Sequence, residues 1–559
     1  MFSRIRCPSP CRAIWLRCCG RTRSGWTGWF TEGEAVKRND LLLTALSALL
    51  LALSRLPLHL GWLVFFAWLP LLRVFERGQA SSRDLLRMGF IMSVVYCGIV
   101  FYWLFYVHPG ALPGVMLVYI FAYYLVFYGI NRIFLTLPRW RWVGFLSILI
   151  TFEYIQNFGE TRFPWFNQAY SLAEYGVLIQ AADLIGVVGL SVLIICVNLL
   201  LFQLCPCLPK RLRNRSQSVV ELPEAFGKKQ IGVLAALLLI FAVWFGYGWH
   251  CQTRLKLERH DACIHVIQPS IPQVLKWEPE QYEASLAIFR DLTKKAVADS
   301  ARLVIWPEGA MIGDLDRVSR ARRDLRALID STQVDVFTGF QHYVYDPSHP
   351  VGTRSYNAAS LFQRNNFDHE LYFKNILVPV GERMLWLHLF PFLWKVNLGQ
   401  ANWEFGSKLV TYESGGYSFS PSICYELAFP EIFHRMAMPR DSLSGSYSKC
   451  DYLANITNDA WFGTSYGLWL HAMMSRFRAV ENRIQIYRSA NTGISMVVDP
   501  KGRILAKTGL NEVTTITAPL YTTPKIPLIR KIYRYPFLFV ALAAILALTA
   551  RIRKPGGKP

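Results

Sequence analysis

Eight apolar stretches recur along this sequence, and they constrain its fold more than any other feature. They lie at about 40–55, 58–75, 86–107, 112–136, 142–158, 178–204, 230–249 and 535–550. A helix of about 20 apolar residues crosses the hydrocarbon core of a bilayer, and most of these stretches approach that length. The sequence therefore predicts an α-helical membrane bundle of about eight transmembrane helices. The first two stretches could instead form a re-entrant hairpin.

Lys and Arg residues cluster in alternate connections between these stretches, and this alternation predicts how the chain lies in the membrane. The basic segments are 1–38, 73–87, 139–141, 210–229 and 551–554, whereas the connections near 108–111 and 159–175 are poor in positive charge. Cytoplasmic loops of membrane proteins are rich in Lys and Arg. We therefore expect both termini in the cytoplasm and the long segment 251–532 on the opposite, extracytoplasmic face.

Composition agrees with this division of the 559-residue chain. Hydrophobic residues make up 53% of it, which is too much for a wholly soluble protein. The net charge of +22 would suit a nucleic-acid-binding protein, but the positive residues mostly flank apolar stretches, so we expect no nucleic acid partner. The expected parts are a basic leader (1–38), a transmembrane region of seven spans (39–250), an extracytoplasmic domain (251–532) and a last transmembrane helix with a basic tail (533–559).

The extracytoplasmic segment alternates short β-type runs with helical patterns, which is typical of an α/β domain. The expected strands are Cys263–Gln268, Arg302–Trp306, Val334–Gly339, Tyr417–Cys424, Tyr452–Thr457 and Ile494–Val498. A helix is expected after Pro279 and Glu280, because residues suited to a buried face recur there at three- and four-residue steps. These residues are Tyr282, Leu286, Phe289, Thr293 and Ala296.

Three residues of this segment could together catalyse acyl transfer. Glu308 follows a short apolar run, Cys424 ends another, and Lys374 lies between them in the sequence. A carboxylate can take a thiol proton, an ammonium can lower the thiol pKa and stabilise an oxyanion, and a thiolate can form a thioester. Each residue alone also fits a structural role, as a surface carboxylate, a surface lysine or a buried core cysteine.

The remaining cysteines point to no metal site. The twelve cysteines do not repeat a zinc-ligand spacing with partner histidines, so we expect neither a metal nor another cofactor. Cys263 and Cys450 share the extracytoplasmic segment with Cys424. Because pairing cannot be read from a sequence, a disulfide between Cys263 and Cys450 stays open.

Four strings in the same segment resemble the nitrilase superfamily. They are WPEGA at 306–310, FKNILVPVGE at 373–382, SICYE at 422–426 and TNDAWFG at 457–463. IPQVLKW at 271–277, together with Glu153 and FPWFNQ from 163, is similar to one membrane branch, the bacterial apolipoprotein N-acyltransferases. The resemblance implies a nitrilase-like αββα sandwich for 251–532. It also implies a bacterial inner membrane location, with the catalytic domain on the periplasmic side.

The resemblance also implies roles for individual residues. Glu308 would be general base and acid, Lys374 the cation beside the oxyanion, and Cys424 the nucleophile. Glu382 matches a second carboxylate that orients Lys374, or it forms a structural salt bridge. Further positions that match residues around the family's site are Trp277, Asn357, Tyr425, Glu426, Trp461 and Trp165. Trp461 and Trp165 fit equally well as anchors at the membrane interface.

The implied reaction has two half-reactions. Cys424 takes an acyl chain from a membrane phospholipid as a thioester and then gives it to the α-amine of an S-diacylglyceryl cysteine that begins an apolipoprotein. One alternative is a membrane-tethered amidase that hydrolyses a lipid amide with the same three residues. Another is a scaffold without catalysis, which would have no need of all three.

An aromatic stretch, MLWLHLFPFLWKVNL at 384–398, follows shortly after Glu382, the last residue of the string FKNILVPVGE. The stretch is too short, and too interrupted by Pro391, to cross a bilayer. We expect an arm or lid whose aromatic face meets the membrane or covers the acyl chain. The alternative is a buried core helix.

Overall fold

The computed structural model describes residues 38–77, 80–204, 227–272, 279–311, 313–317, 319–395, 401–438 and 448–553. The basic leader up to residue 37, Trp277, residues 396–398 of the expected arm and the basic tail from residue 554 lie outside the described residues.

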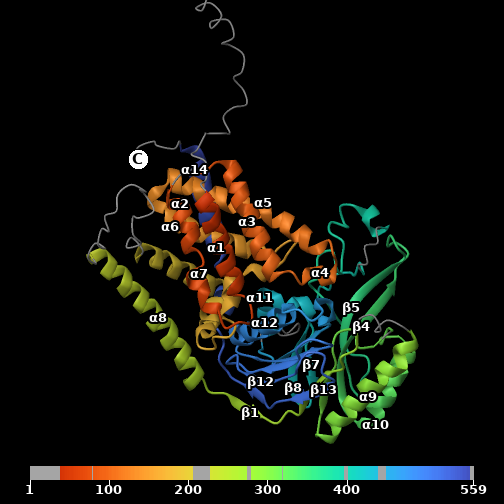
Figure 1. Ribbon diagram of the computed structural model, residues 1–559. Coiled ribbons are helices and arrows are strands. Elements are labelled where there is room, and N and C mark those ends of the chain that lie inside the picture. Colours follow the sequence, from red (N-terminus) through yellow and green to blue (C-terminus); the bar gives the residue numbers. More distant parts are fainter. Residues whose placement is uncertain are drawn as a thin grey trace, which may run out of the picture.

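Helices dominate the first half of the chain and pack into a bundle (Figure 1). They are α1 (Arg38–Leu53), α2 (Leu69–Arg77), α3 (Ser82–Val100), α4 (Leu104–Val107), α5 (Ala111–Thr136), α6 (Arg141–Ile155), α7 (Ala182–Leu204) and α8 (Lys228–Arg254). α14 (Phe537–Ile552) returns to the bundle from the far end of the chain and packs on α5 and α6. Helices from both ends of the described chain therefore take part in the bundle.

Three helices of the described chain are long and apolar enough to cross a membrane, namely Ala111–Thr136, Leu178–Leu204 and Lys228–Arg254. The count of eight spans and their orientation stay predictions. The stretch expected at 58–75 is not one helix, because it is divided between a 3₁₀ turn at Gly61–Phe65 and the short α2. Pro57 and Pro70 lack backbone donors on either side of that turn, which explains the interruption. α2 packs on α1, and the re-entrant hairpin stays a prediction.

Two six-stranded sheets lie between α8 and α14 in the sequence, with strand orders β13-β2-β3-β4-β5-β6 and β12-β11-β10-β9-β8-β7. The first contains β2 (Ile264–Gln268), β3 (Leu303–Ile305), β4 (Asp335–Tyr345), β5 (Thr353–Phe362), β6 (Tyr372–Phe373) and β13 (Thr514–Thr517). The second contains β7 (Tyr412–Ser414), β8 (Tyr417–Ile423), β9 (Tyr452–Thr457), β10 (Gln485–Ala490), β11 (Met496–Val498) and β12 (Ile504–Lys507). β1 (Glu258–His260) and β14 (Leu520–Thr522) form a separate pair. Each large sheet has a parallel centre, β2-β3-β4 in one and β8-β9-β10 in the other.

The two sheets face each other, and helices cover their outer faces, which makes an αββα sandwich (Figure 1). α9 (Tyr282–Ala298) and α10 (Arg320–Thr332) cover the first sheet, and α11 (Pro430–Met436) and α12 (Gly467–Asn482) lie on the side of the second. Between the sheets, the fully buried rings of Phe337 and Phe419 meet edge to face with centroids 5.2 Å apart. The expected apolar face of α9 is confirmed, because all five of its residues are buried.

α12 joins the sandwich to the bundle, because it packs on α7 as well as on β10 and β11. Glu481 of α12 accepts a hydrogen bond from the Val187 N–H at 2.8 Å. Gly186, with a φ of 64°, interrupts α7 just before that N–H. Next to this contact, the buried Arg483 and Asp183 form an ion pair at 2.8 Å. A charged contact therefore fixes how the sandwich sits on the bundle.

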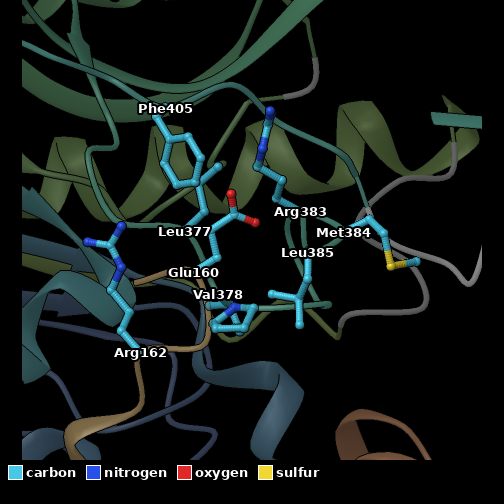
Figure 2. Close-up of a pocket in the computed structure, with 9 residues that line it drawn as sticks. Glu160, Arg162, Leu377, Val378, Arg383, Met384, Leu385 and Phe405 are labelled. Atoms are coloured by element: carbon cyan, nitrogen blue, oxygen red, sulfur yellow. The ribbon is translucent and has the colours of Figure 1, made fainter. Parts of the chain in front are cut away.

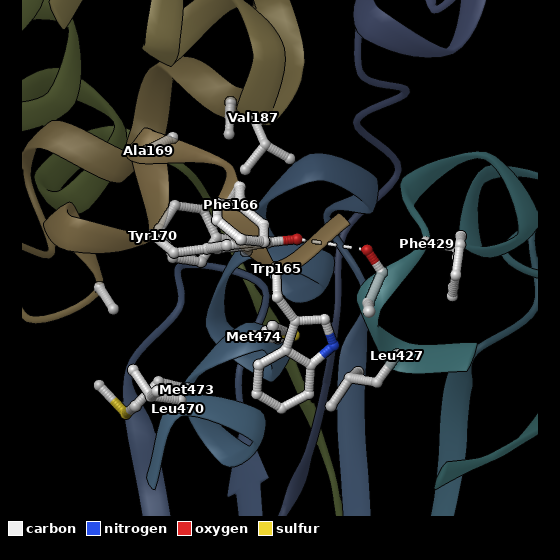
Figure 3. Packing of buried hydrophobic residues seen from close by; sticks show 14 of the residues in the cluster. Trp165, Phe166, Ala169, Tyr170, Val187, Leu427, Phe429, Leu470, Met473 and Met474 are labelled. Atoms are coloured by element: carbon white, nitrogen blue, oxygen red, sulfur yellow. Dashed lines mark hydrogen bonds between the residues drawn. The ribbon is translucent and has the colours of Figure 1, made fainter. Parts of the chain in front are cut away.

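The connection between α6 and α7 forms the adjoining apolar contact (Figure 3). Trp165 and Tyr170 of this connection lie with Met474 of α12 in one buried cluster. The Tyr170 hydroxyl donates to the Ala428 carbonyl at 3.3 Å, in the short 3₁₀ helix η10 (Cys424–Ala428) that follows β8. The segment that begins with Cys424 thus rests directly on the bundle.

Replacing Phe419 with Ala should lower the free energy of unfolding by about 3–5 kcal/mol, because the residue fills the space between the sheets. Chemical denaturation of the full chain in detergent measures this change. Tyr345→Ala is the control, because that side chain is 74% exposed and its loss should change stability by less than about 0.5 kcal/mol. Equal losses for the two variants would contradict the packing described here.

Candidate active site

Two of the three candidate catalytic residues follow the carboxyl ends of parallel strands, whereas Lys374 follows β6, an antiparallel strand at the edge of its sheet. Glu308 comes three residues after β3, and Cys424 comes immediately after β8. Asn458 comes immediately after β9 in the same sheet as Cys424. Sites in α/β folds collect at such strand ends, where side chains from separate parts of the sequence meet.

The carboxylate of Glu308 is held through both oxygens. Its Oε1 accepts a hydrogen bond from Asn357 Nδ2 at 2.6 Å and lies 3.5 Å from Lys374 Nζ. Its Oε2 accepts from the Asn458 N–H at 2.8 Å. Gly339 leaves the space that this arrangement needs, because a Cβ at that position would lie 3.1 Å from the Glu308 Cα. The carboxylate is therefore oriented before any substrate binds.

Lys374 is fully buried and lies between two carboxylates. Its Nζ donates to Glu382 Oε1 at 2.7 Å, and the other Glu382 oxygen accepts from the Val378 N–H at 2.8 Å. Burial lowers the pKa of Lys374, but the negative charges of Glu308 and Glu382 outweigh it and raise the pKa above its ordinary value. Lys374 is therefore an ammonium, held at a fixed place between two carboxyl groups.

Cys424 is partly exposed and has a φ of 49°, a backbone conformation that is uncommon for residues other than glycine. Burial raises the pKa of its thiol above the ordinary value, the negative charge of Glu308 raises it further, and Lys374 opposes them. The ammonium lowers the thiol pKa as expected, but burial and the Glu308 carboxylate are stronger, so the net pKa is raised. At neutral pH the thiol keeps its proton, so a base must remove it when the sulfur attacks.

Glu426 links the turn that carries Cys424 to the loop that carries Lys374. Its fully buried carboxylate accepts hydrogen bonds from the Ile423 N–H at 2.7 Å and the Asn375 N–H at 2.6 Å. The Tyr372 hydroxyl donates to it at 2.7 Å. Burial raises the pKa of Glu426 to about 7. Glu426 therefore acts as a clamp that holds the turn of Cys424 and the loop of Lys374 together.

A second buried network lies behind Cys424, and the sequence interpretation missed it. His471 Nε2 is 3.2 Å from the Cys424 carbonyl oxygen, and His471 Nδ1 is 3.0 Å from Asp459 Oδ1. Arg488 Nη2 donates to Asp459 Oδ2 at 2.6 Å. Asp459 stands within the string TNDAWFG, which marks it in the sequence. His471 and Arg488 lie in no such string, and only their buried neighbours distinguish them from other polar residues.

The other expected residues have different positions. The Tyr425 hydroxyl donates to the Arg162 carbonyl at 2.7 Å. Trp165 is 1% exposed and its ring lies 5.8 Å from that of His471, so its interpretation as an interfacial anchor is wrong. Trp461 is 49% exposed. The disulfide that the sequence left open is absent, because Cys263 and Cys450 are free thiols.

A pocket lies beside Glu382, between the α6–α7 connection and the sandwich (Figure 2). Its lining residues are Glu160, Arg162, Leu377, Val378, Pro379, Arg383, Met384, Leu385 and Phe405. Glu160 accepts a hydrogen bond from the Trp386 N–H, and its Oε1 lies 2.9 Å from His388 Nδ1. The membrane region thus holds the first part of the aromatic arm against the sandwich.

The described part of the arm, residues 384–395, is not a buried core helix, so that alternative is wrong. Its regular structure is a short 3₁₀ turn, Pro391–Lys395. Four large apolar side chains are exposed, namely Trp386 at 45%, Leu389 at 61%, Phe390 at 46% and Phe392 at 66%. Trp394 differs, because its ring contacts His349 with centroids 4.5 Å apart and lies under Arg383. The arm therefore presents an exposed apolar surface, and Trp394 is not part of that surface.

The raised pKa of Cys424 predicts how its alkylation depends on pH. The rate of its reaction with iodoacetamide should keep rising through about pH 9, where an ordinary thiol of pKa near 8.5 approaches its plateau. Glu308→Gln removes a negative charge, so it should lower the thiol pKa and shift the alkylation profile to lower pH. Mass spectrometry of the Cys424 peptide measures the rate.

Glu370→Gln is the matched control for this experiment, because Glu370 is exposed and pairs with Lys408. It should leave the alkylation profile unchanged. A Cys424 plateau below pH 8, or an alkylation profile shifted to higher pH in Glu308→Gln, would contradict the electrostatic description of the site.

Two family models match separate parts of the chain, one in the bundle and one in the sandwich. The model of the apolipoprotein N-acyltransferase N-terminal domain matches residues 47–200, and the model of the carbon-nitrogen hydrolase domain matches residues 265–522. Among solved structures, an amidase of Nesterenkonia from the nitrilase superfamily is 17% identical, with a TM-score of 0.34, and the match covers 49% of this chain and 95% of the amidase.

Relatives match across both parts of the chain. The apolipoprotein N-acyltransferase of Geobacter metallireducens is 32% identical over 495 residues, which is 85% of this chain and 88% of that protein. The apolipoprotein N-acyltransferase of Rickettsia typhi is 30% identical over 386 residues, which is 68% of this chain and 71% of that protein. The match to the Geobacter protein includes the bundle as well as the sandwich. The chain therefore belongs to the apolipoprotein N-acyltransferase family.

Proposed function

We propose that this protein transfers an acyl chain from a membrane phospholipid to the N-terminal α-amine of a diacylated apolipoprotein, through a thioester on Cys424. The observation that carries the proposal is the buried Lys374, held between Glu308 and Glu382 and close enough to Cys424 that its charge opposes the rise in the thiol pKa. It provides a base, a fixed cation and a thiol within one site. Membership of the apolipoprotein N-acyltransferase family supports the acyltransferase reading over the amidase alternative.

In the first half-reaction, Glu308 takes the thiol proton as the Cys424 sulfur attacks the ester carbonyl of the phospholipid. Lys374 stabilises the negative oxygen of the tetrahedral intermediate. The intermediate collapses to a thioester, and Glu308 returns the proton to the leaving lysophospholipid oxygen. The raised pKa of the Cys424 thiol is the reason that this step needs a base.

In the second half-reaction, the α-amine of the apolipoprotein attacks the thioester carbonyl. Glu308 takes the proton that the amine loses, Lys374 again stabilises the oxyanion, and the amide product leaves as Cys424 regains its proton. Glu382 orients Lys374 in both halves, because it accepts the shorter of the two hydrogen bonds from Nζ.

The membrane arrangement belongs to the same proposal. We place the chain in a bacterial inner membrane with about eight spans, cytoplasmic termini and a periplasmic sandwich. The three long apolar helices and the alternation of basic segments support this arrangement. Both substrates are lipids anchored at the membrane surface, so a sandwich that rests on the bundle keeps Cys424 within their reach.

Acyl-labelled phospholipid should transfer its label to Cys424 of the purified protein, and neutral hydroxylamine should release that label, because thioesters are cleaved under this condition. Adding a diacylated lipopeptide should then move the label to an amide on the peptide. Cys424→Ala should take up no label, and Glu370→Gln is the control for surface charge. Label that persists in Cys424→Ala would contradict the thioester. Release as a free fatty acid with no amide would favour the amidase.

We propose that the arm at 384–398 meets the lipid through its exposed side chains. The double variant Phe390→Asn, Phe392→Asn should raise the apparent KM for phospholipid in mixed micelles by about tenfold, because partial burial of two such rings contributes about 1–2 kcal/mol and each 1.4 kcal/mol is a factor of about ten. Its unfolding temperature should stay near that of the unsubstituted protein. Trp394→Asn is the matched comparison, and it should lower stability, because this ring packs on His349. An unchanged KM in the double variant would exclude the role in lipid binding.

A further inference from the structure

We propose that His471 is a positioning residue, which holds the peptide between Cys424 and Tyr425 so that the Tyr425 N–H can donate to the oxyanion together with Lys374. The inference concerns the site of the proposed function and rests on it for the identity of the acyl donor. The observation behind it is the contact of 3.2 Å between His471 Nε2 and the Cys424 carbonyl oxygen.

Cys424 needs such support because its backbone is strained. It is the first residue of η10 and has a φ of 49°, and a cysteine side chain disfavours that conformation. Residues in this region keep their conformation only when surrounding contacts impose it. The Glu426 clamp holds the flanking Ile423 N–H, and His471 holds the carbonyl of Cys424 itself.

The hydrogen bond has one direction whatever the charge of the ring. A carbonyl oxygen only accepts, so His471 Nε2 carries a proton and donates it. Both the neutral ring with its proton on Nε2 and the charged ring satisfy this requirement. The contact with the Cys424 carbonyl thus requires a proton on Nε2 of His471.

The imidazole is fixed on its other sides. Asp459 Oδ1 lies 3.0 Å from its Nδ1, and Arg488 fixes Asp459 from the opposite oxygen at 2.6 Å. Asp459 and Arg488 are fully buried, and His471 is 1% exposed. The rings of Trp165 and Phe462 lie 5.8 Å and 5.7 Å from the imidazole. Trp165 comes from the α6–α7 connection, so the membrane bundle contributes to the support of the nucleophile.

Holding the carbonyl also sets the direction of the next N–H. In a trans peptide the C=O and N–H groups point in opposite directions, so fixing the Cys424 carbonyl fixes the Tyr425 N–H. Tyr425 lies in the first turn of η10, where N–H groups have no acceptor within the helix. A backbone N–H directly after a nucleophile at a tight turn is a donor that acyl-transfer sites use for the oxyanion.

The test compares acylation of Cys424, which forms an oxyanion, with its alkylation, which forms none. The full-length protein in detergent is acylated with p-nitrophenyl butyrate, and iodoacetamide measures thiol reactivity. His471→Leu should lower the acylation rate by about 100-fold, the range found when an oxyanion donor is lost. Alkylation should change by less than about threefold, and the KM for the ester should stay within about twofold.

Two conservative variants keep the test decisive if His471→Leu folds poorly. His471→Gln retains an N–H that can reach the Cys424 carbonyl and should recover most of the acylation rate. His471→Asn is equally polar but shorter, so it should stay slow. His434→Gln is the control, because that buried histidine bonds Asn482 instead. Equal acylation by the Gln and Asn variants, or a parallel loss of acylation and alkylation, would overturn the proposal.

The activated ester separates this inference from the proposed function. In one outcome, phospholipid fails to label Cys424, yet the ester acylates Cys424 quickly in His471→Gln and slowly in His471→Asn and His471→Leu. The role of His471 then stands, and the proposed acyl donor is wrong. If phospholipid labels Cys424 and the His471 variants acylate like the unsubstituted protein, the proposed function stands and the role of His471 is wrong.

Discussion

The charge balance around Lys374 is the constraint on which the site depends. A fully buried ammonium is unfavourable unless anions and hydrogen bonds replace its water, and here Glu308 and Glu382 replace it. The same arrangement orients Glu308, whose oxygens are also held by Asn357 and by the Asn458 N–H. Removal of Lys374 would leave two buried carboxylates without a cation, and removal of both carboxylates would leave a buried ammonium without an anion. The cation and its two carboxylates therefore act as one unit.

Two further contacts join this unit to the turn of Cys424, the proposed nucleophile, and to the helical bundle. Glu426 joins the turn of Cys424 to the loop of Lys374 through the backbone of Ile423 and Asn375. α12 and the α6–α7 connection place the same turn on the bundle, with Trp165 against His471. An enzyme whose substrates are membrane lipids gains from this arrangement, because its nucleophile and its membrane anchor belong to one packed structure.

Much of the fold could be predicted from local patterns. The expected strands at 263–268, 302–306, 334–339, 417–424, 452–457 and 494–498 each overlap an observed strand, and the buried face of α9 is as expected. The other eight strands of the described chain were missed, and β10 is among them although all its residues are buried. The central strands of a sandwich are buried on both faces, so they lack the alternation that marks a half-exposed strand. Arg488 and Gln485 obscure the pattern further, because their polar groups are paired inside the protein.

The sequence by itself determined the apolar helices, the α/β pattern and the strings that contain Glu308, Lys374 and Cys424, because these depend on residue type and local spacing. Only the tertiary structure decided that burial and Glu308 raise the thiol pKa despite Lys374. It also decided that Trp165 is a buried neighbour of His471 rather than an interfacial anchor. The physical reason is that burial, electrostatic environment and backbone strain depend on which distant segments pack together, and spacing along the chain does not specify that packing.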